Sequence, residues 1–485
     1  MTRVKRRDIL KTAAGALAAG VMFPSGIAAS QEQQTPTRRR PKARNPRKVV
    51  VAGGGIGGLC CAYELMMRGH EVVLFEASGR TGGHVKTIHD PLAEGLYADV
   101  GAEHFTKPGY DLYWGYVGEF NLTPLYYPHR EHVIRFINGK RYTEEDLANP
   151  KALSGFGFTE REIDCLCQHP WWDFASLYLN PYLDSFPDEY KPFAAGLNNL
   201  DNVSFNDVLK KDGASPAAIE LIGNGGSALH VIWHAAILKK RGVPLAPPVV
   251  YRLKGGNQEL PNAFAHRLGE RVHLNAPVTG IEHGSSGVRV SYREFDQEKT
   301  MEADYLVCCM DAYLLRRLPV TPAWPEPKAY AINTVAYDMY SRVVFQSRSA
   351  FWERDRISPN WEGADANLAE MWRMAEEVDT PRAILVATAG NGAAAQDALA
   401  AFRRIYWGQS EDIEQAVIQT WANEPWAMAC ETVTYRVGDL KKMWPAIIQP
   451  VGRVHFASAY TDNLNWGQEA ATRSANRVAE AIDAA

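Results

Sequence analysis

Residues 48–76 read KVVVAGGGIGGLCCAYELMMRGHEVVLFE, and this stretch determines the fold. An apolar run, a glycine turn, apolar positions at helical spacing and a second apolar run predict strand, turn, helix and strand. Gly53, Gly55 and Gly58 occupy the glycine positions of the dinucleotide-binding fingerprint, and the second strand ends in Glu76. Such glycines let the backbone approach a pyrophosphate at a helix N-terminus, while the acid accepts hydrogen bonds from a ribose diol. The stretch therefore predicts an α/β, Rossmann-like dinucleotide-binding domain.

A second glycine turn follows directly after Glu76. It reads Ala77-Ser78-Gly79-Arg80-Thr81-Gly82-Gly83, and Asp99-Val100-Gly101-Ala102-Glu103-His104 comes farther on. This combination resembles the flavin-containing amine oxidase family, which includes monoamine oxidases, polyamine oxidases and L-amino-acid oxidases. The resemblance implies FAD as the cofactor, and it places five further residues at cofactor-binding positions: Arg80, Gly82, Gly83, Gly101 and Ala102. The alternative is that the second turn is an ordinary surface loop.

Two later blocks extend the resemblance, at residues 254–309 and 452–479. They imply an FAD-binding domain assembled from residues 48–125, 249–321 and 422–485, with a mixed α+β substrate domain built from residues 126–248 and 322–421. In the family, the position of Val278 contacts the adenine end of FAD, and a closing strand and helix face the flavin ring; the matching residues here are Ala457, Gln468 and Glu469. Ala459 departs from the family, which usually has a glutamate there.

Arg342 stands where the family normally has a lysine that holds a water against flavin N5. Arginine keeps the charge, but its guanidinium is permanently protonated and cannot act as a base. The replacement leaves two electron acceptors open, oxygen and an exported electron carrier. The alternative for Arg342 is a surface residue on an edge strand.

Three residues are expected near the flavin ring. Cys430 matches the cysteine that bonds covalently to the flavin 8α carbon in monoamine oxidases, and the alternative is a small buried thiol. Glu431 replaces an aromatic wall of the substrate cage, and Trp466 is expected to border the substrate beside it. Because a carboxylate in a dry site is tolerated only when it is paired, the substrate is predicted to carry a positive charge or a hydrogen-bond donor.

The N-terminus resembles a targeting signal. Lys5-Arg6-Arg7-Asp8-Ile9-Leu10-Lys11 precedes a short apolar run and the small residues Ala28-Ala29-Ser30, so residues 1–30 match a twin-arginine signal peptide. The run is too short for a permanent membrane anchor. This predicts twin-arginine export and a periplasmic or secreted protein; the alternative is a basic arm. Residues 31–47 are predicted to be a basic disordered linker.

Composition excludes several classes of function. The formal charge is −4, but the first 48 residues carry twelve Lys/Arg against two acids, so the remainder carries −14. This acidic body argues against a nucleic-acid partner. The seven cysteines show no metal-ligand spacing, so no metal site is expected. No second dinucleotide fingerprint follows Gly58, which argues against a separate NAD(P)H site.

The sequence therefore predicts an exported FAD-dependent oxidoreductase that oxidises an amine or amino acid to an imine by hydride transfer to flavin. Arg342, Glu431 and Ala459 depart from the amine oxidase pattern. Two alternatives accordingly stay open: a flavin-dependent desaturase or dehydrogenase acting on a carbon–carbon bond, and a flavin-binding protein without turnover.

Overall fold

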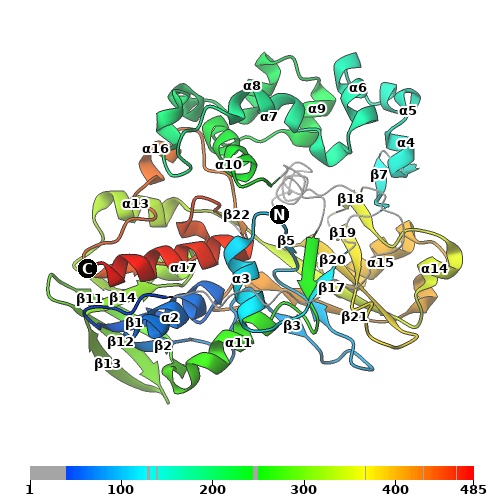
Figure 1. Ribbon diagram of the computed structural model, residues 1–485. Helices are drawn as coiled ribbons and strands as arrows, with labels where there is room; N and C mark the ends of the chain where they lie inside the picture. Colours follow the sequence, from blue (N-terminus) through cyan, green and yellow to red (C-terminus); the bar gives the residue numbers. More distant parts are fainter. Residues whose placement is uncertain are drawn as a thin grey trace.

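A computed structural model describes residues 40–127, 132–137, 140–243, 250–365, 367–429, 431–465 and 467–485 (Figure 1). The predicted twin-arginine signal lies outside the described residues, as do Cys430 and Trp466. The described chain mixes helices and sheets, in agreement with the predicted α/β class. Within it, no helix combines the length and the apolar character that crossing a membrane requires.

The predicted dinucleotide-binding domain contains a five-stranded parallel sheet. Its strand order is β10 (Val272–His273), β2 (Glu71–Phe75), β1 (Lys48–Ala52), β14 (Tyr305–Cys308) and β23 (Val454–Phe456). These strands come from chain segments far apart in the sequence. Because the strands are parallel, their carboxyl ends share one edge, where ligands bind in folds of this type.

Strand β1 is buried on both faces, so its apolar run is continuous. Val49 and Val51 pack toward α2 (Ile56–Arg68) and α17 (Gly467–Asp483), which lie side by side in Figure 1. Val50 packs toward a mixed sheet of β13 (Gln297–Ala303), β12 (Val288–Glu294), β11 (Val278–His283) and β15 (Val320–Thr321), in which only β11 and β15 are parallel. The sheet is therefore covered by helices on one face and by strands on the other.

The two predicted substrate segments meet in a seven-stranded sheet. Its order is β21 (Ile413–Thr420), β17 (Tyr340–Ser347), β20 (Ala383–Gly390), β19 (Leu368–Met374), β18 (Trp361–Asp365), β7 (Ile134–Ile137) and β8 (Lys140–Tyr142). Strand β7 pairs with β18 in parallel register. This pairing joins the early segment to the later one across more than two hundred intervening residues.

Helices form a separate layer at the top of Figure 1. This layer contains α4 (Glu144–Leu147), α5 (Pro150–Ser154), α6 (Glu160–Gln168), α7 (Ser176–Leu183), α8 (Phe205–Lys211), α9 (Pro216–Ile222) and α10 (Ala228–Lys240). The remaining longer helices are α3 (Asp111–Glu119), α11 (Glu259–Leu268), α13 (Glu326–Thr334) and α15 (Ala395–Ile405). The smaller sheets of the described residues are two two-stranded ladders and one three-stranded sheet. The ladders are β3 (Thr87–Ile88) with β4 (Ala98–Asp99) and β16 (Tyr337–Asp338) with β22 (Glu431–Thr432); the three-stranded sheet has the order β5 (Phe105–Thr106), β9 (Val250–Leu253) and β6 (Pro124–Tyr126).

Residues 40–47, which the sequence assigned to a disordered linker, are bound to the body of the protein. Arg40 donates from Nε and Nη2 to Glu64 at 2.9 and 2.8 Å and from Nη1 and Nη2 to Glu119 at 3.0 and 2.8 Å. Glu64 is fully buried on α2. Composition suggested disorder because the segment is polar, but a buried carboxylate supplies a specific partner for its arginine.

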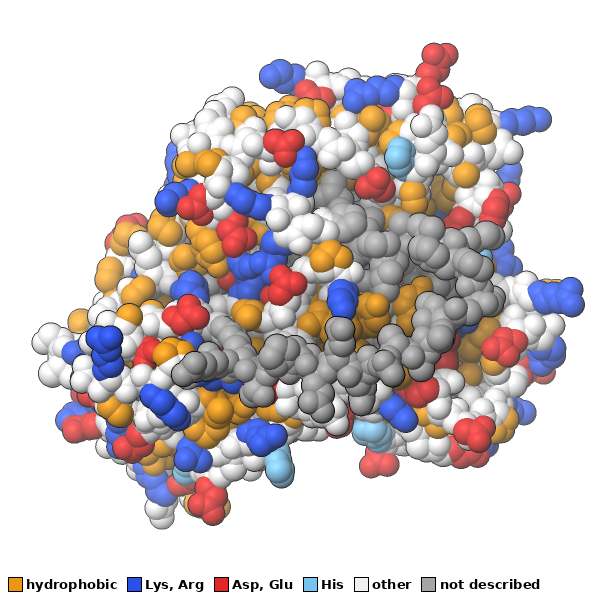
Figure 2. All heavy atoms as spheres, viewed as in Figure 1, with side chains coloured by type: hydrophobic (Ala, Val, Ile, Leu, Met, Phe, Trp, Pro, Cys, Tyr) orange, Lys and Arg blue, Asp and Glu red, His pale blue; other side chains and the backbone are white. Residues whose placement is uncertain are grey.

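Figure 2 shows the surface of the face drawn in Figure 1. Its described atoms place lysine and arginine next to aspartate and glutamate, without a continuous basic surface. Such an arrangement is typical of a solvated surface and does not favour binding to nucleic acid.

Candidate functional site

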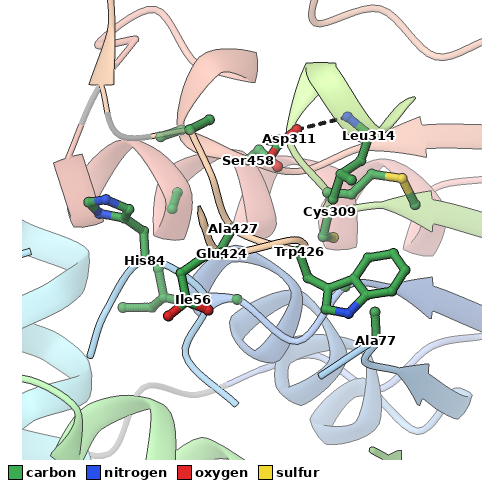
Figure 3. Close-up of a pocket in the computed structure, with 18 of the residues that line it drawn as sticks. Ile56, Ala77, His84, Cys309, Asp311, Leu314, Glu424, Trp426, Ala427 and Ser458 are labelled. Atoms are coloured by element: carbon green, nitrogen blue, oxygen red, sulfur yellow. Dashed lines mark hydrogen bonds between the residues drawn. The ribbon is translucent and has the colours of Figure 1, made fainter. Parts of the chain in front are cut away.

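A cavity of about 630 Å³ lies at the carboxyl edge of the five-stranded sheet. Residues from all three predicted FAD segments line it, and they include Gly55, Glu76, Arg80, Val278 and Gln468. Its size falls in the range of small-molecule sites, roughly 300–1,000 Å³. Figure 3 draws residues that line the cavity, among them Ile56, Ala77 and Cys309, which come after β1, β2 and β14 in the chain.

The first glycine turn, Gly53 to Gly58, packs too closely against backbone atoms to accommodate side chains at Gly53 and Gly58. Gly53 has φ of 113°, and a Cβ added there would lie 3.0 Å from the Cys309 carbonyl. A Cβ on Gly58 would lie only 1.9 Å from the Gly53 oxygen. Gly55 precedes α2, and no side chain caps this helix N-terminus. The free amide groups and the helix dipole therefore favour an anion at the turn.

The second glycine turn packs directly on the first. The Gly82 amide donates to the Gly54 carbonyl at 2.8 Å. Arg80 donates to the carbonyls of Gly83 at 2.6 Å, Thr81 at 3.2 Å and Val85 at 3.3 Å, so its guanidinium holds the turn in shape. A Cβ on Gly82 would lie 2.6 Å from the Val85 oxygen. Both turns thus keep a space that side chains would fill.

Glu76 is held rigidly at the end of β2. Its carboxylate accepts from the Gly54 amide at 2.6 Å and from the Ser78 amide and hydroxyl at 2.7 Å each. An ionised carboxylate has about four acceptor positions, so it can still receive a ribose hydroxyl. Val278, the first residue of β11, lines the same cavity.

These residues fit FAD. The cavity contains two glycine turns, the uncapped N-terminus of α2 and the fixed carboxylate of Glu76 as an acceptor. It also reaches Tyr337 and Tyr340. Glu76 would hold the ribose, and the backbone amides around Gly55 would hold the pyrophosphate. When bound, FAD supplies an acceptor for a hydride equivalent from the substrate.

The far end of the cavity lies beside the ladder of β16 and β22. Tyr337 pairs with Thr432 and Asp338 with Glu431 across this ladder, and Tyr337 and Thr432 line the cavity. The backbone of Glu431 is thereby placed next to the cavity wall. The ladder brings together residues that lie almost one hundred positions apart in the sequence.

Arg342 is buried on β17, an inner strand of the seven-stranded sheet. Its guanidinium approaches Glu103 at 3.6 Å and lies 4.6 Å from the Tyr340 ring and 4.9 Å from the Trp372 ring. Strand β17 pairs with β20 on one side and β21 on the other, so it is not an edge strand. The edge-strand alternative for Arg342 is therefore wrong.

Four described residues that were predicted to bind the cofactor are not part of the cavity lining: Gly58, Gly101, Ala457 and Glu469. Gly101 packs against the His84 carbonyl, and a Cβ added to Gly101 would lie 1.8 Å from that oxygen. Ala457 packs against the start of α2, where its carbonyl oxygen would lie 2.8 Å from a Cβ added to Gly57. Glu469 accepts from the amides of Leu112 at 3.2 Å and Tyr113 at 2.9 Å, and burial raises its pKa to about 7. Gly101, Ala457 and Glu469 support the cavity wall, and Gly58 lets α2 pack close to the Gly53 carbonyl. Direct contact of these four residues with FAD remains a prediction. Ala102 and Gln468, in contrast, line the cavity.

His84 is a site residue that the sequence patterns did not indicate. It lines the cavity immediately after Gly83, and its ring lies 3.9 Å from the Trp421 ring. Burial and the nearby Arg342 and Arg80 lower the pKa of His84 to about 3, so the imidazole is neutral at physiological pH. The sequence feature that could have indicated His84 as a site residue is its position directly after the glycine pair Gly82-Gly83.

Glu424 and Trp426 were also missed, although both line the cavity. Glu424 accepts from Lys86 Nζ at 2.9 Å and from Gln419 at 2.8 Å. Burial alone would raise the pKa of Glu424, but these hydrogen bonds outweigh it and hold the pKa below its usual value. The only sequence signal was their place between Trp421 and Cys430.

Comparisons with known proteins agree with this geometry. The family model described as flavin containing amine oxidoreductase matches residues 56–483. An L-amino-acid oxidase of Demansia vestigiata is 27% identical over 470 residues, covering 91% of this chain and 87% of the relative. A second L-amino-acid oxidase, from Bothrops moojeni, is 25% identical over 464 residues, covering 91% and 90%.

Solved structures show the same fold. A putrescine oxidase bound to putrescine superimposes with a TM-score of 0.75 at 20% identity, covering 91% of this chain and 100% of that one. Cyclohexylamine oxidase from Brevibacterium oxydans gives a TM-score of 0.73 at 19% identity, covering 91% and 99%.

Proposed function

Because this chain belongs to the flavin-containing amine oxidoreductase family, we propose that it is an exported enzyme that oxidises a positively charged amine or amino acid to the imine. It is an FAD-dependent oxidoreductase of the amine oxidase type. The observation that carries the proposal is the single cavity that runs from the two glycine turns to Tyr337, Tyr340 and the β16–β22 ladder.

The chain's own residues would orient the substrate and exclude water. Tyr337 and Tyr340 supply aromatic walls. The ladder register sets Asp338 opposite Glu431, so two acidic residues adjoin this end of the site. A carboxylate in a dry site is tolerated only when it is paired, and a cationic substrate would supply the partner. This supports an ammonium group as the recognised feature of the substrate.

Arg342 would provide a fixed positive charge beside Tyr340. Because a guanidinium does not release its proton, Arg342 can orient water or stabilise negative charge but cannot act as a proton acceptor. Oxygen and an exported electron carrier both remain acceptors compatible with this role.

Anaerobic titration tests the proposed function. The purified yellow protein is mixed without oxygen with amines, amino acids and phenolic compounds, and absorbance of the oxidised flavin is followed. An amine or amino acid is expected to bleach the flavin. Bleaching by a substrate that lacks nitrogen, with no response to amines, would instead support oxidation of a carbon–carbon bond.

Glu431→Gln is expected to raise KM for a cationic amine by roughly ten- to one-hundred-fold, with a much smaller change for a neutral analogue, because one charged hydrogen bond contributes about 1.5–3 kcal/mol. Steady-state kinetics on both substrates measure the difference. The matched control is Glu220→Gln at an exposed position on α9. Equal changes in KM for the two substrates would show that Glu431 does not recognise the positive charge of the substrate.

Replacing Arg6 and Arg7 by lysine is expected to block export while keeping the charge, because the twin-arginine pair is read by a receptor rather than by net charge. The measurement is the amount of flavoprotein in the periplasm and in the cytoplasm. Normal periplasmic accumulation of the double variant would identify the N-terminus as a basic arm only.

Acid precipitation tests the covalent hypothesis for Cys430. If the thiol is bonded to the flavin, yellow colour stays with the precipitated protein, and Cys430→Ala moves it to the supernatant. Cys165→Ala, which removes a half-buried thiol on α6, is the control. Colour in the supernatant of the unmodified protein would make Cys430 a packing residue.

A further inference from the structure

Residues 424–427 form a strap across the cavity, and all four line it (Figure 3). Upstream, Trp421 is fully buried and donates from its indole to the Val100 carbonyl at 2.7 Å. Glu424 is bonded to Lys86, which follows the second glycine turn. Downstream, β22 pairs with β16 on another wall. The strap is therefore anchored on both sides of the cavity.

Trp426, in the middle of the strap, lines the cavity with a partly exposed side chain. It is 43% exposed, and among the described residues no other exposed large hydrophobic side chain lines the cavity. Its indole N–H makes no hydrogen bond within the described part of the chain. An exposed aromatic face and a free donor in a cavity wall indicate a ligand surface, because tryptophan normally buries its ring and pairs its N–H.

The surroundings of Trp426 identify which part of the cavity it covers. Figure 3 draws its indole on the same side of the cavity as Ala77 and Cys309. Ala77 directly follows the ribose acceptor Glu76, and the Cys309 carbonyl is the nearest neighbour of a Cβ on Gly53. Glu424 also lies close enough to Arg80 to interact with its charge. The strap therefore covers the two glycine turns.

We propose that Trp426 closes the cavity over the adenosine diphosphate half of FAD and controls how fast the cofactor leaves. The indole ring covers the adenosine, and its N–H donates to a ribose or phosphate oxygen. Contacts between aromatic rings stabilise beyond the area they bury. This contact concerns the cofactor alone, so it holds whichever substrate the enzyme oxidises.

The test measures release of FAD from Trp426→Ala, Trp426→Phe and Trp407→Ala, each built on Cys430→Ala so that a covalent bond cannot mask dissociation. Trp407 is 88% exposed and lies outside the cavity, which makes it the matched control. Release is followed by recovery of flavin fluorescence after dilution, and access to the pyrophosphate by its rate of cleavage with a phosphodiesterase.

Trp426→Ala is expected to speed both rates by about ten-fold or more, and Trp426→Phe by less, because phenylalanine keeps an aromatic face but lacks the N–H. Trp407→Ala should leave both rates unchanged. Thermal unfolding of the FAD-free forms should be the same for Trp426→Ala and Trp407→Ala, which separates a cofactor contact from a structural role. Rates for Trp426→Ala within two-fold of the control would overturn the proposal. If Trp426→Ala does not fold, the Trp426→Phe rates decide in the same way.

Discussion

Gly58→Ala is expected to leave the protein colourless, with FAD binding weakened by about 100-fold or more. The added Cβ would lie 1.9 Å from the Gly53 carbonyl oxygen, and this oxygen belongs to the backbone of the first glycine turn. A backbone carbonyl cannot rotate away like a side chain, so the start of α2 must move off the sheet. Overpacking of this kind costs roughly 1–3 kcal/mol, and it also displaces the amides that hold the pyrophosphate.

The measurement is the ratio of FAD to protein after purification, together with FAD affinity. Gly115→Ala is the matched control, since Gly115 also lies inside a helix, α3, and a Cβ there meets nothing within 4 Å. This control is expected to keep its flavin and to be more stable by up to about 1 kcal/mol, because alanine is the better helix former. A yellow Gly58→Ala protein with full FAD content would refute the assignment of the pyrophosphate turn.

Arg40→Ala is expected to lower the free energy of unfolding by about 1.5–3 kcal/mol, the usual contribution of hydrogen bonds to a charged group. The Arg40 side chain is 3% exposed, and Glu64 beneath it is fully buried. Tyr116 also donates to Glu64 at 2.6 Å, and Arg68 Nη2 lies 3.7 Å from the same carboxylate, so Glu64 keeps a more distant cationic partner when Arg40 is removed. Chemical denaturation of the purified protein measures the loss.

Arg289→Ala is the control for this prediction. Arg289 bridges Glu282 and Glu302 at 3.2 and 2.8 Å, but these side chains are about half or more exposed, so the loss should be only about 0–1 kcal/mol. Equal losses for the two arginine variants would show that residues 40–47 contribute no more than a surface contact.

Local sequence patterns predicted the cofactor-binding half of the molecule well. Strand β1, helix α2 and strand β2 form consecutively, and their apolar periodicity and glycine spacing depend only on neighbouring residues. Gly53, Gly55 and Glu76 accordingly lie together in the cavity. The resemblance to amine oxidases extended this prediction to Val278 and Gln468, which also line it.

Charge and composition were weaker guides where a distant partner decides the outcome. Residues 40–47 are polar enough to suggest disorder, yet Arg40 reaches carboxylates on α2 and α3. Glu469 follows the cavity-lining Gln468 in sequence, but the helical geometry of α17 turns it toward the amides at the start of α3. Adjacent residues on a helix face different directions, so proximity in sequence did not predict a shared contact.

The sequence by itself determined the strand–turn–helix unit and its dinucleotide chemistry, because backbone conformation at glycine and apolar periodicity are local properties. Only the tertiary structure decided that Arg342 is buried in an interior strand, that β16 and β22 bring Asp338 opposite Glu431, and that Trp426 is carried across the cavity. These arrangements depend on which strands pair and which loops those pairings hold together. Strand pairing is set by the burial of apolar faces contributed by distant segments, and no single stretch of the chain contains that information.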